Sequence, residues 1–149
     1  MKVAIGSDHR GYLLKEQIKS TFTPDNIEFS DMGTKSVESC DFPDYAYPVA
    51  RAVAKGEADK GILICSTGNG MAISANKVKG IRAALVLTPD MARLSRQHNN
   101  ANILVLPADF VDLQIVPKIV KVWLETEFEG GRHQRRLDKI AKYEEENSK

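Results

Sequence analysis

One of the two cysteines, Cys65, stands where a buried apolar run meets a glycine-rich turn. The run Ile62–Ile64 leads into it, and the turn from Ser66 to Gly70 separates it from a helical pattern that begins at Met71. This order points backbone N–H groups, and the positive end of a helix, at whatever lies beside the sulfur. We therefore predict a thiol that ionises more easily than a free one, in a place that stabilises an anion. The alternative interpretation is a small buried core residue.

The turn itself narrows the chemistry of this thiol. Gly68 and Gly70 allow the backbone to approach a ligand closely, and Thr67 can donate a hydrogen bond or relay a proton. A cysteine-based phosphatase needs an arginine six residues after its cysteine to hold the phosphate, and Met71 occupies that place. The sequence therefore argues against a phosphatase.

A second polar cluster, Asp8 and His9, follows the first apolar run of the chain. We interpret Asp8 as a hydrogen-bond partner for a substrate hydroxyl, and His9 as a group that binds an anion or moves a proton. The alternative is that Asp8 caps the following helix while His9 is solvated.

His98 and Asn99 end the fourth helical pattern. A histidine near a helix C-terminus interacts well with the helix dipole, and asparagine is a common C-cap, so a purely structural role is the alternative to a functional one.

A basic cluster lies near the C-terminus, where Arg132 and Arg136 are spaced to share one face of a helix. Two guanidinium groups on one face suit a phosphate monoester. The alternative is a solvated helix start that pairs with the acidic run at 144–146.

The segment 40–45 supplies a turn and a helix start, with Asp44 as the expected N-cap. Asp41 and Phe42 are close enough in sequence to border a pocket, although we favour a structural role for both.

Short apolar runs alternate with longer amphipathic ones along the whole chain. We expect strands at 2–7, 27–31, 60–65, 82–87 and 102–106, and helices at 11–22, 44–55, 71–77, 89–99 and 111–127, with a polar helical segment over 132–146. Such alternation predicts a five-stranded parallel sheet covered on both faces, a three-layer α/β/α Rossmann-like fold formed by a single domain over 1–149.

Pro117 marks either a kink or the true first turn of its helix. Because apolar residues are sparse in the last segment, we expect it to pack on a surface or on a partner subunit.

Ligands of open parallel sheets bind beyond the carboxyl ends of the strands. The first expected strand ends just before Asp8 and the third ends at Cys65. We therefore expect both clusters to line the same edge.

Bulk properties exclude several functional classes. Of 149 residues, 42% are hydrophobic and 28% charged, and the formal net charge of +1 favours neither nucleic acid nor a membrane surface. No signal peptide and no apolar stretch of about 20 residues is evident. Two cysteines predict free thiols in a reducing, cytoplasmic compartment and are too few for a structural zinc site.

Seven motifs, taken together, resemble the ribose-5-phosphate isomerase B family, within the broader group that includes the galactose-6-phosphate isomerase subunits. They extend from the first strand to about residue 140: Gly6-Ser7-Asp8-His9-x-Gly11, Asp41-x-Pro43-Asp44-Tyr45, Cys65-x-Thr67-Gly68-x-Gly70, Ser74-Ala75-Asn76-Lys77, Gly80-Ile81-Arg82-Ala83, Ser95-Arg96-Gln97-His98-Asn99 and Gly130-Gly131-Arg132-His133-x-x-Arg136. The resemblance implies interconversion of ribose 5-phosphate and ribulose 5-phosphate through an enediolate, without metal or organic cofactor.

The resemblance also implies roles for individual residues. Cys65 would be the base that moves a proton between C2 and C1, and His98 would open the sugar ring, assisted by Thr67. The enediolate oxygens would be held by the turn residues Ser66, Thr67, Gly68, Asn69 and Gly70. Asp8 and Asn99 would bind sugar hydroxyls, and the phosphate would be held by His9, Arg132 and Arg136. The protein would be a homodimer or tetramer whose active site is shared between subunits.

Four positions depart from the family pattern: Ser66 replaces glycine, Asn69 replaces an apolar or small residue, Phe42 replaces tyrosine and Asp109 replaces arginine. A lost positive charge at Asp109 would weaken phosphate binding or indicate a different sugar. Allose 6-phosphate and galactose 6-phosphate are the alternative substrates, and a non-catalytic sugar-phosphate-binding protein is the alternative function. A dinucleotide site is disfavoured because the segment 6–11 lacks the middle glycine of the fingerprint.

Overall fold

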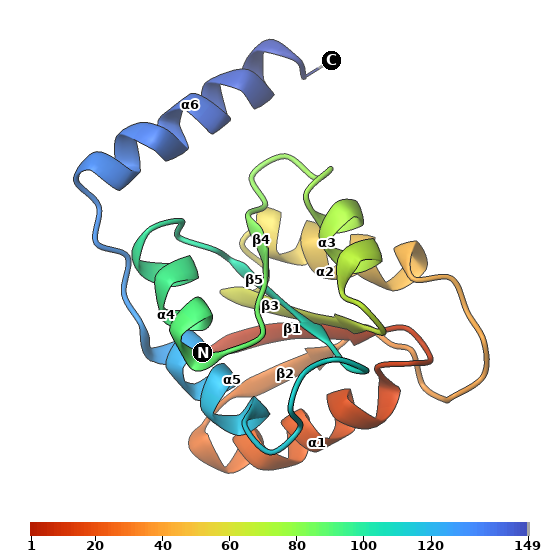
Figure 1. Ribbon diagram of the computed structural model, residues 1–149. Helices are drawn as coiled ribbons and strands as arrows, with labels where there is room; N and C mark the ends of the chain where they lie inside the picture. The colour runs from red at the N-terminus through yellow and green to blue at the C-terminus, as the bar shows by residue number, and fades with distance from the viewer. Residues whose placement is uncertain (149) are drawn as a thin grey trace.

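A computed structural model describes residues 1–148, and its centre is a five-stranded sheet in the order β2-β1-β3-β5-β4. Every neighbouring pair is parallel (Figure 1). The strands are β1 (Lys2–Ser7), β2 (Glu28–Asp31), β3 (Lys60–Cys65), β4 (Ala83–Leu85) and β5 (Ile103–Pro107). The predicted parallel sheet is confirmed, and two of its strands have the predicted bounds.

Helices cover both faces of the sheet. They are α1 (Tyr12–Phe22), α2 (Pro43–Ala54), α3 (Asn69–Ala75), α4 (Pro89–Gln97), α5 (Val116–Glu125) and α6 (Arg132–Glu146), with a short 3-10 turn, η1 (Thr23–Asp25), after α1. Apolar residues of α1, α4 and α5 pack in one core cluster, and those of α2 and α3 pack in the other. The predicted three-layer α/β/α architecture is therefore confirmed.

Alternation along β3 decides which layer receives the Cys65 thiol. Ile62 and Ile64 point into the cluster below α1 and α5, whereas Leu63 and Cys65 point into the cluster with α2 and α3. Because side chains alternate between the two faces of a strand, the last residue of β3 is directed toward the helix that follows it. This places the sulfur beneath the start of α3.

Three local predictions were wrong. The fourth strand is shorter than expected, and α5 begins at Val116 rather than 111, so that Pro117 lies in its first turn. Asp44 is not the N-cap of α2, because Pro43 already occupies the first turn and Phe42 is the cap. Both helix starts follow from the same rule: proline lacks the N–H that a helix interior needs, but it fits the first turn.

Strand β1 lies between β2 and β3, so the chain reverses its direction across the sheet at this point. Crevices at such a reversal, beyond the carboxyl ends of the strands, are the usual ligand sites of open α/β sheets. Asp8 follows β1 and Cys65 ends β3, so the two flank this point as the sequence predicts.

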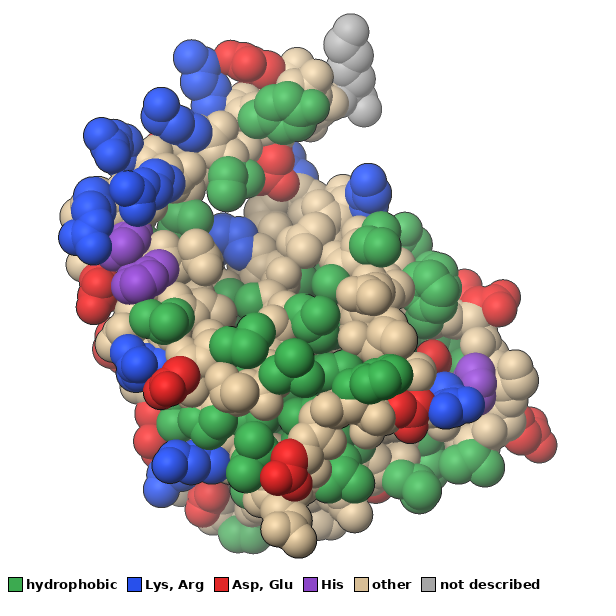
Figure 2. All heavy atoms as spheres, in the orientation of Figure 1, with side chains coloured by type: hydrophobic (Ala, Val, Ile, Leu, Met, Phe, Trp, Pro, Cys, Tyr) green, Lys and Arg blue, Asp and Glu red, His purple; other side chains and the backbone are tan. Residues whose placement is uncertain are grey.

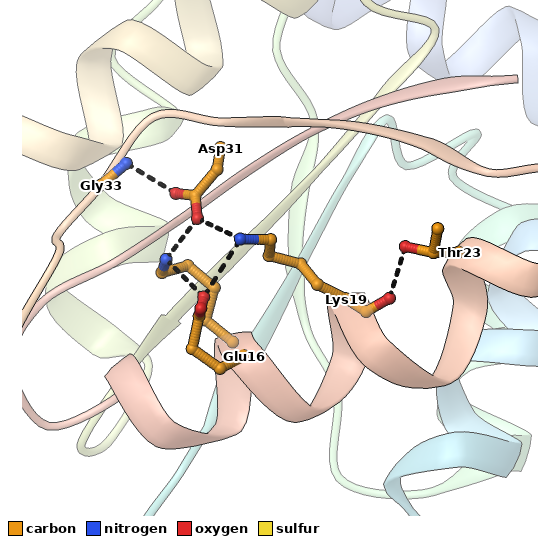
Figure 3. Close-up of polar contacts among 6 residues, drawn as sticks. Glu16, Lys19, Thr23, Asp31 and Gly33 are labelled. Carbon is orange, nitrogen blue, oxygen red and sulfur yellow. Dashed lines mark hydrogen bonds and ion pairs between the residues drawn. The ribbon is translucent and has the colours of Figure 1, made fainter.

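A network of charges lies beneath the end of β1 (Figure 3). Lys15 is only 1% exposed, and its Nζ lies 2.7 Å from Asp31 Oδ2, which Lys19 Nζ also approaches at 2.7 Å. The other carboxylate oxygen, Asp31 Oδ1, accepts the Gly33 N–H at 2.9 Å. The Gly33 carbonyl in turn accepts the Ser7 N–H at 2.8 Å. The network thus ties α1 to the ends of β2 and β1, next to Asp8.

Helix α6 extends away from the sheet and its covering helices (Figure 1). Glu145 forms an ion pair with Lys79, and a Glu144 carboxylate oxygen accepts the Gly80 N–H at 3.1 Å. Between this helix and the body lies a cavity of about 920 Å³, lined by residues that include Arg82, Asn99 and Tyr143. Among residues 1–148, no helix combines the length and the apolar character needed to cross a bilayer.

Candidate active site

The Cys65 sulfur is surrounded by main-chain N–H groups, as predicted. The backbone N–H groups of Gly68, Gly70 and Met71 act on the thiol as hydrogen-bond donors, and each lowers its pKa and so favours the thiolate. The backbone around the sulfur is fixed from the other side, because the Cys65 carbonyl accepts the Ala108 N–H at 2.9 Å. The arrangement is a preformed set of donors for an anion.

The prediction that this thiol ionises more easily than a free one is wrong. Cys65 is only 5% exposed, and this burial raises the pKa of its thiol above the ordinary value. The negative charge of Asp8 raises the pKa further, while the three amides lower it without reversing the shift. Desolvation of the thiolate therefore outweighs the hydrogen bonds, an effect that the position of a residue in a motif does not reveal.

Gly68 is required by the shape of the turn. Its backbone has a φ of +80°, a conformation that favours glycine, and a Cβ at this position would lie 2.4 Å from Leu85 Cδ1. The next residues open α3, with the Asn69 N–H donating to Thr67 Oγ1 at 3.2 Å. The Phe42 ring lies over the same turn, since a Cβ on Gly70 would be 2.8 Å from Phe42 Cε1. The turn cannot shift outward without displacing these neighbours.

Asp8 has a structural task as well as a place beside the sulfur. Its Oδ1 accepts the N–H groups of Arg10 at 2.9 Å and Gly11 at 3.1 Å, which forms the turn into α1. The N-cap of α1 is Gly11 rather than Asp8. Because both main-chain bonds use Oδ1, these contacts leave Oδ2 for another donor.

His9 is oriented by the segment before α2. Its Nδ1 accepts the Cys40 N–H at 3.2 Å, and Cys40 Sγ lies 3.8 Å from the same nitrogen. A ring nitrogen that accepts a hydrogen bond carries no proton, so the proton of the neutral ring lies on Nε2. His9 is thereby prepared to donate from Nε2 to an anion. Cys40, to which the sequence assigns no role, supplies this backbone contact.

Arg10 joins the site through a contact that the sequence interpretation missed. Its Nη2 lies 2.7 Å from Asp109 Oδ2, and Ser66 Oγ donates to the same oxygen at 2.7 Å. The hydrogen bond from Ser66 and then that from Arg10 lower the pKa of Asp109. The two family departures Ser66 and Asp109 thus contact one another and recruit a third residue. Ser66 and Asp109 both differ from the family pattern, and that shared difference is the sequence signal that could have identified their contact.

The remaining predicted residues gather beside α6. His98 caps the end of α4, and its ring stacks on that of His133 with centroids 4.3 Å apart and planes 14° from parallel. Glu129 Oε1 lies 4.0 Å from His98 Nε2. Asn99 follows on the chain, and Arg132 and Arg136 lie in α6, at exposed positions. His133 and Glu129 were not among the predicted site residues.

The predicted residues therefore form two groups at opposite edges of the sheet. We call Asp8, His9, Cys65 and residues 66–70 the thiol half-site. The histidine half-site contains His98, Asn99, Glu129, Arg132, His133 and Arg136. Helix α4 ends just before β5 begins, so His98 lies by the amino ends of the strands, whereas Cys65 lies at a carboxyl end. Figure 2 accordingly shows histidine side chains in two places on opposite sides of the molecule.

The histidine half-site holds side chains of types that also bind metals. One ligand atom from each of His98, Glu129 and His133 lies within 4.8 Å of the others. The positive charges of Arg132 and Arg136 act on this cluster and oppose the entry of a divalent cation.

Comparison with known proteins is consistent across the whole chain. The family model described as Ribose/Galactose Isomerase matches residues 3–140. Ribose-5-phosphate isomerase B of Escherichia coli is 47% identical over 144 residues, which cover 97% of both chains. The Ribose-5-P isomerase B of Listeria innocua is 39% identical and covers 99% of both.

Solved structures agree with the sequence relatives. Ribose-5-phosphate isomerase B of Clostridium thermocellum superposes with a TM-score of 0.97 at 50% identity, covering 99% of this chain and 100% of its own. The Mycoplasma genitalium enzyme, whose structure contains bound ribulose 5-phosphate, superposes with a TM-score of 0.94 at 46% identity and 97% coverage of both chains.

Proposed function

The chain belongs to the ribose/galactose isomerase family, among its ribose-5-phosphate isomerase B members, and we propose that its two half-sites meet across a dimer with Cys65 as the catalytic base. The reaction is the interconversion of ribose 5-phosphate and ribulose 5-phosphate. A cytoplasmic location and one catalytic domain per chain are part of the proposal. The observation that carries it is the Cys65 sulfur among the amides of Gly68, Gly70 and Met71.

Binding begins with the phosphate. His9 donates from Nε2, and Arg132 and Arg136 of the partner subunit supply two guanidinium groups. Asp8 Oδ2 and Asn99 of the partner subunit bind sugar hydroxyls. Remote contacts of this kind fix the reacting carbons relative to the base, which supplies part of the rate enhancement.

Ring opening precedes isomerisation, because the predominant form of the aldose is a furanose. His98 of the partner subunit gives a proton to the ring oxygen as the bond from that oxygen to C1 breaks. The C1 hydroxyl loses its proton through Thr67, and C1 becomes an aldehyde.

Proton transfer between carbons follows. The Cys65 thiolate removes the proton from C2, and the electron pair moves to the C1 oxygen, which gives an enediolate held by the turn amides. The thiol then returns its proton to C1, and the ketose forms as the proton of the C2 hydroxyl moves to the C1 oxygen and C2 becomes the carbonyl carbon. The raised pKa of Cys65 leaves fewer ionised thiols at neutral pH, but makes each thiolate a stronger base.

Shared half-sites can be tested with mixed subunits. Cys65→Ala and His98→Asn chains, each inactive alone, are combined so that hybrids form. A hybrid holds one intact site, from Cys65 of one chain and His98 of the other, and one site that lacks both groups. Random mixing makes half of the dimers hybrid, so about a quarter of wild-type activity should return, measured as ribulose 5-phosphate formed without added metal. If no activity returns from a verified hybrid, the shared site is wrong.

A further inference from the structure

His133 and Glu129 surround His98 in a way that the proposed function does not use. His133 is 5% exposed, and within residues 1–148 its Nε2 has no hydrogen-bond partner. Its ring lies parallel to that of His98 at a centroid distance of 4.3 Å. A buried ring stacked on another in this way limits the tilt of its partner ring.

The backbone of Glu129 holds this residue beside His98. Its N–H donates to the carbonyl of Gln97 at 3.1 Å, directly before His98. Its carboxylate Oε1 lies 3.5 Å from His133 Nε2 and 4.0 Å from His98 Nε2. One carboxylate therefore faces both imidazoles, at a distance where a charge on either ring would be stabilised.

The two rings differ in their surroundings. Burial lowers the pKa of His133, and the positive charges of Arg132, His98 and Arg136 lower it further against the opposing effect of Glu129. The His98 side chain is 39% exposed. Of the two stacked imidazoles, His98 is therefore the one that a substrate can reach.

Building on the proposed function, we propose that His133 and Glu129 are positioning residues that hold the His98 ring in place for ring opening. His133 is the buried, fixed face of the stack. Glu129 Oε1 faces the Nε2 atoms of both rings. Arg132 and Arg136, the other charged groups beside the stack, face the substrate phosphate.

The test separates ring opening from carbon deprotonation. Ribulose 5-phosphate has no furanose form, since its C5 oxygen carries the phosphate and its C4 hydroxyl is too near the carbonyl. Exchange of its C1 hydrogen with D2O therefore reports the base alone. Glu129→Gln and His133→Asn should lower ribose 5-phosphate turnover roughly tenfold, a part of what general acid catalysis supplies, and leave this exchange near the wild-type rate.

Two controls complete the experiment. Glu125→Gln removes an exposed carboxylate near the end of α5 and should change neither rate, while Glu129→Asp should restore part of the turnover. Equal losses of turnover and exchange would overturn the inference. Cys65→Ala with wild-type C1 exchange would instead refute the proposed base.

Discussion

The two half-sites are built from different materials. The thiol half-site is made mainly of backbone: three N–H groups around one sulfur, on a turn that only glycine fits at position 68. The histidine half-site is made of side chains, with a ring stack, a carboxylate and two arginines from three separate segments. Backbone donors hold an anion that forms and disappears within one turnover, whereas side chains supply the protons and charges that must change state.

The largest effect that tests this comparison is the loss of the sulfur. Cys65→Ala should lower kcat at least about 10³-fold, because the proposed base for C2 is removed while the amides remain. Affinity for ribose 5-phosphate, measured by calorimetry, should fall little, since the phosphate contacts are untouched. A near-normal kcat in this variant would show that another group is the base.

The second effect is on the turn that carries the amides. Gly68→Ala should lower kcat about 10²-fold, because its Cβ would meet Leu85 at 2.4 Å and force the donors out of place. Gly80→Ala is the matched control: Gly80 also has a positive φ, +87°, but no atom within 4 Å of a Cβ there. Both variants should lose about 1–3 kcal/mol of stability from backbone strain, measured by urea unfolding. If the control loses activity equally, strain rather than displacement of the amides is responsible.

The same contrast explains what the sequence could predict. A short apolar run, a cysteine and a turn with two glycines define a strand, a sharp reversal and a helix start, so the thiol half-site and the sheet edge with Asp8 were predictable. The burial of the Cys65 sulfur was not predictable, because it depends on α2 and on the Phe42 ring that lies over the turn. The expected direction of the Cys65 pKa shift was therefore wrong.

The histidine half-site depends on contacts that no local pattern fixes. The segment between α5 and α6 folds back so that Glu129 bonds Gln97, which brings His133 onto His98. The sequence showed the spacing of Arg132 and Arg136 and the histidine at the end of α4. It did not show that these two segments lie beside each other. The Arg10 contact with Asp109 was missed for the same reason, since these residues are 99 positions apart.

A pH profile tests the burial of the thiol half-site. Because the folded pKa of Cys65 is raised, the thiolate fraction and hence kcat should rise through neutral pH toward the alkaline side, roughly tenfold per pH unit well below that pKa. A rising limb centred below the pKa of a free thiol would contradict the burial argument.

A smaller effect is expected from the phosphate arginines. Arg136→Ala should raise KM roughly tenfold and leave kcat within a factor of a few, because a charge-assisted hydrogen bond to a nonreacting group contributes about 1.5–3 kcal/mol. Arg135→Ala is the control, since this exposed neighbour projects from a different side of α6. Comparable KM changes in the two variants would mean that net charge, rather than a specific contact, attracts the substrate.

The smallest effect on activity belongs to the charges beneath the thiol half-site. Burial alone would raise the pKa of Asp31, but hydrogen bonds from Lys15, Lys19 and the Gly33 N–H lower it below its usual value. A lowered folded pKa means that the stabilisation is fully present above the unfolded value of about 3.9 and is lost as pH falls through the folded pKa. Asp31→Asn should therefore cost about 2 kcal/mol of unfolding free energy at pH 7, because Lys15 stays buried with a weaker set of partners.

The difference in unfolding free energy between Asp31→Asn and wild type should shrink below pH 4. Asp25→Asn, which removes an exposed carboxylate in η1, is the control and should change the unfolding free energy little at either pH. Because the network reaches the site through main-chain bonds of Gly33 and Gly11, kcat at 25 °C should stay within a factor of about two. A larger loss would make these charges part of the thiol half-site.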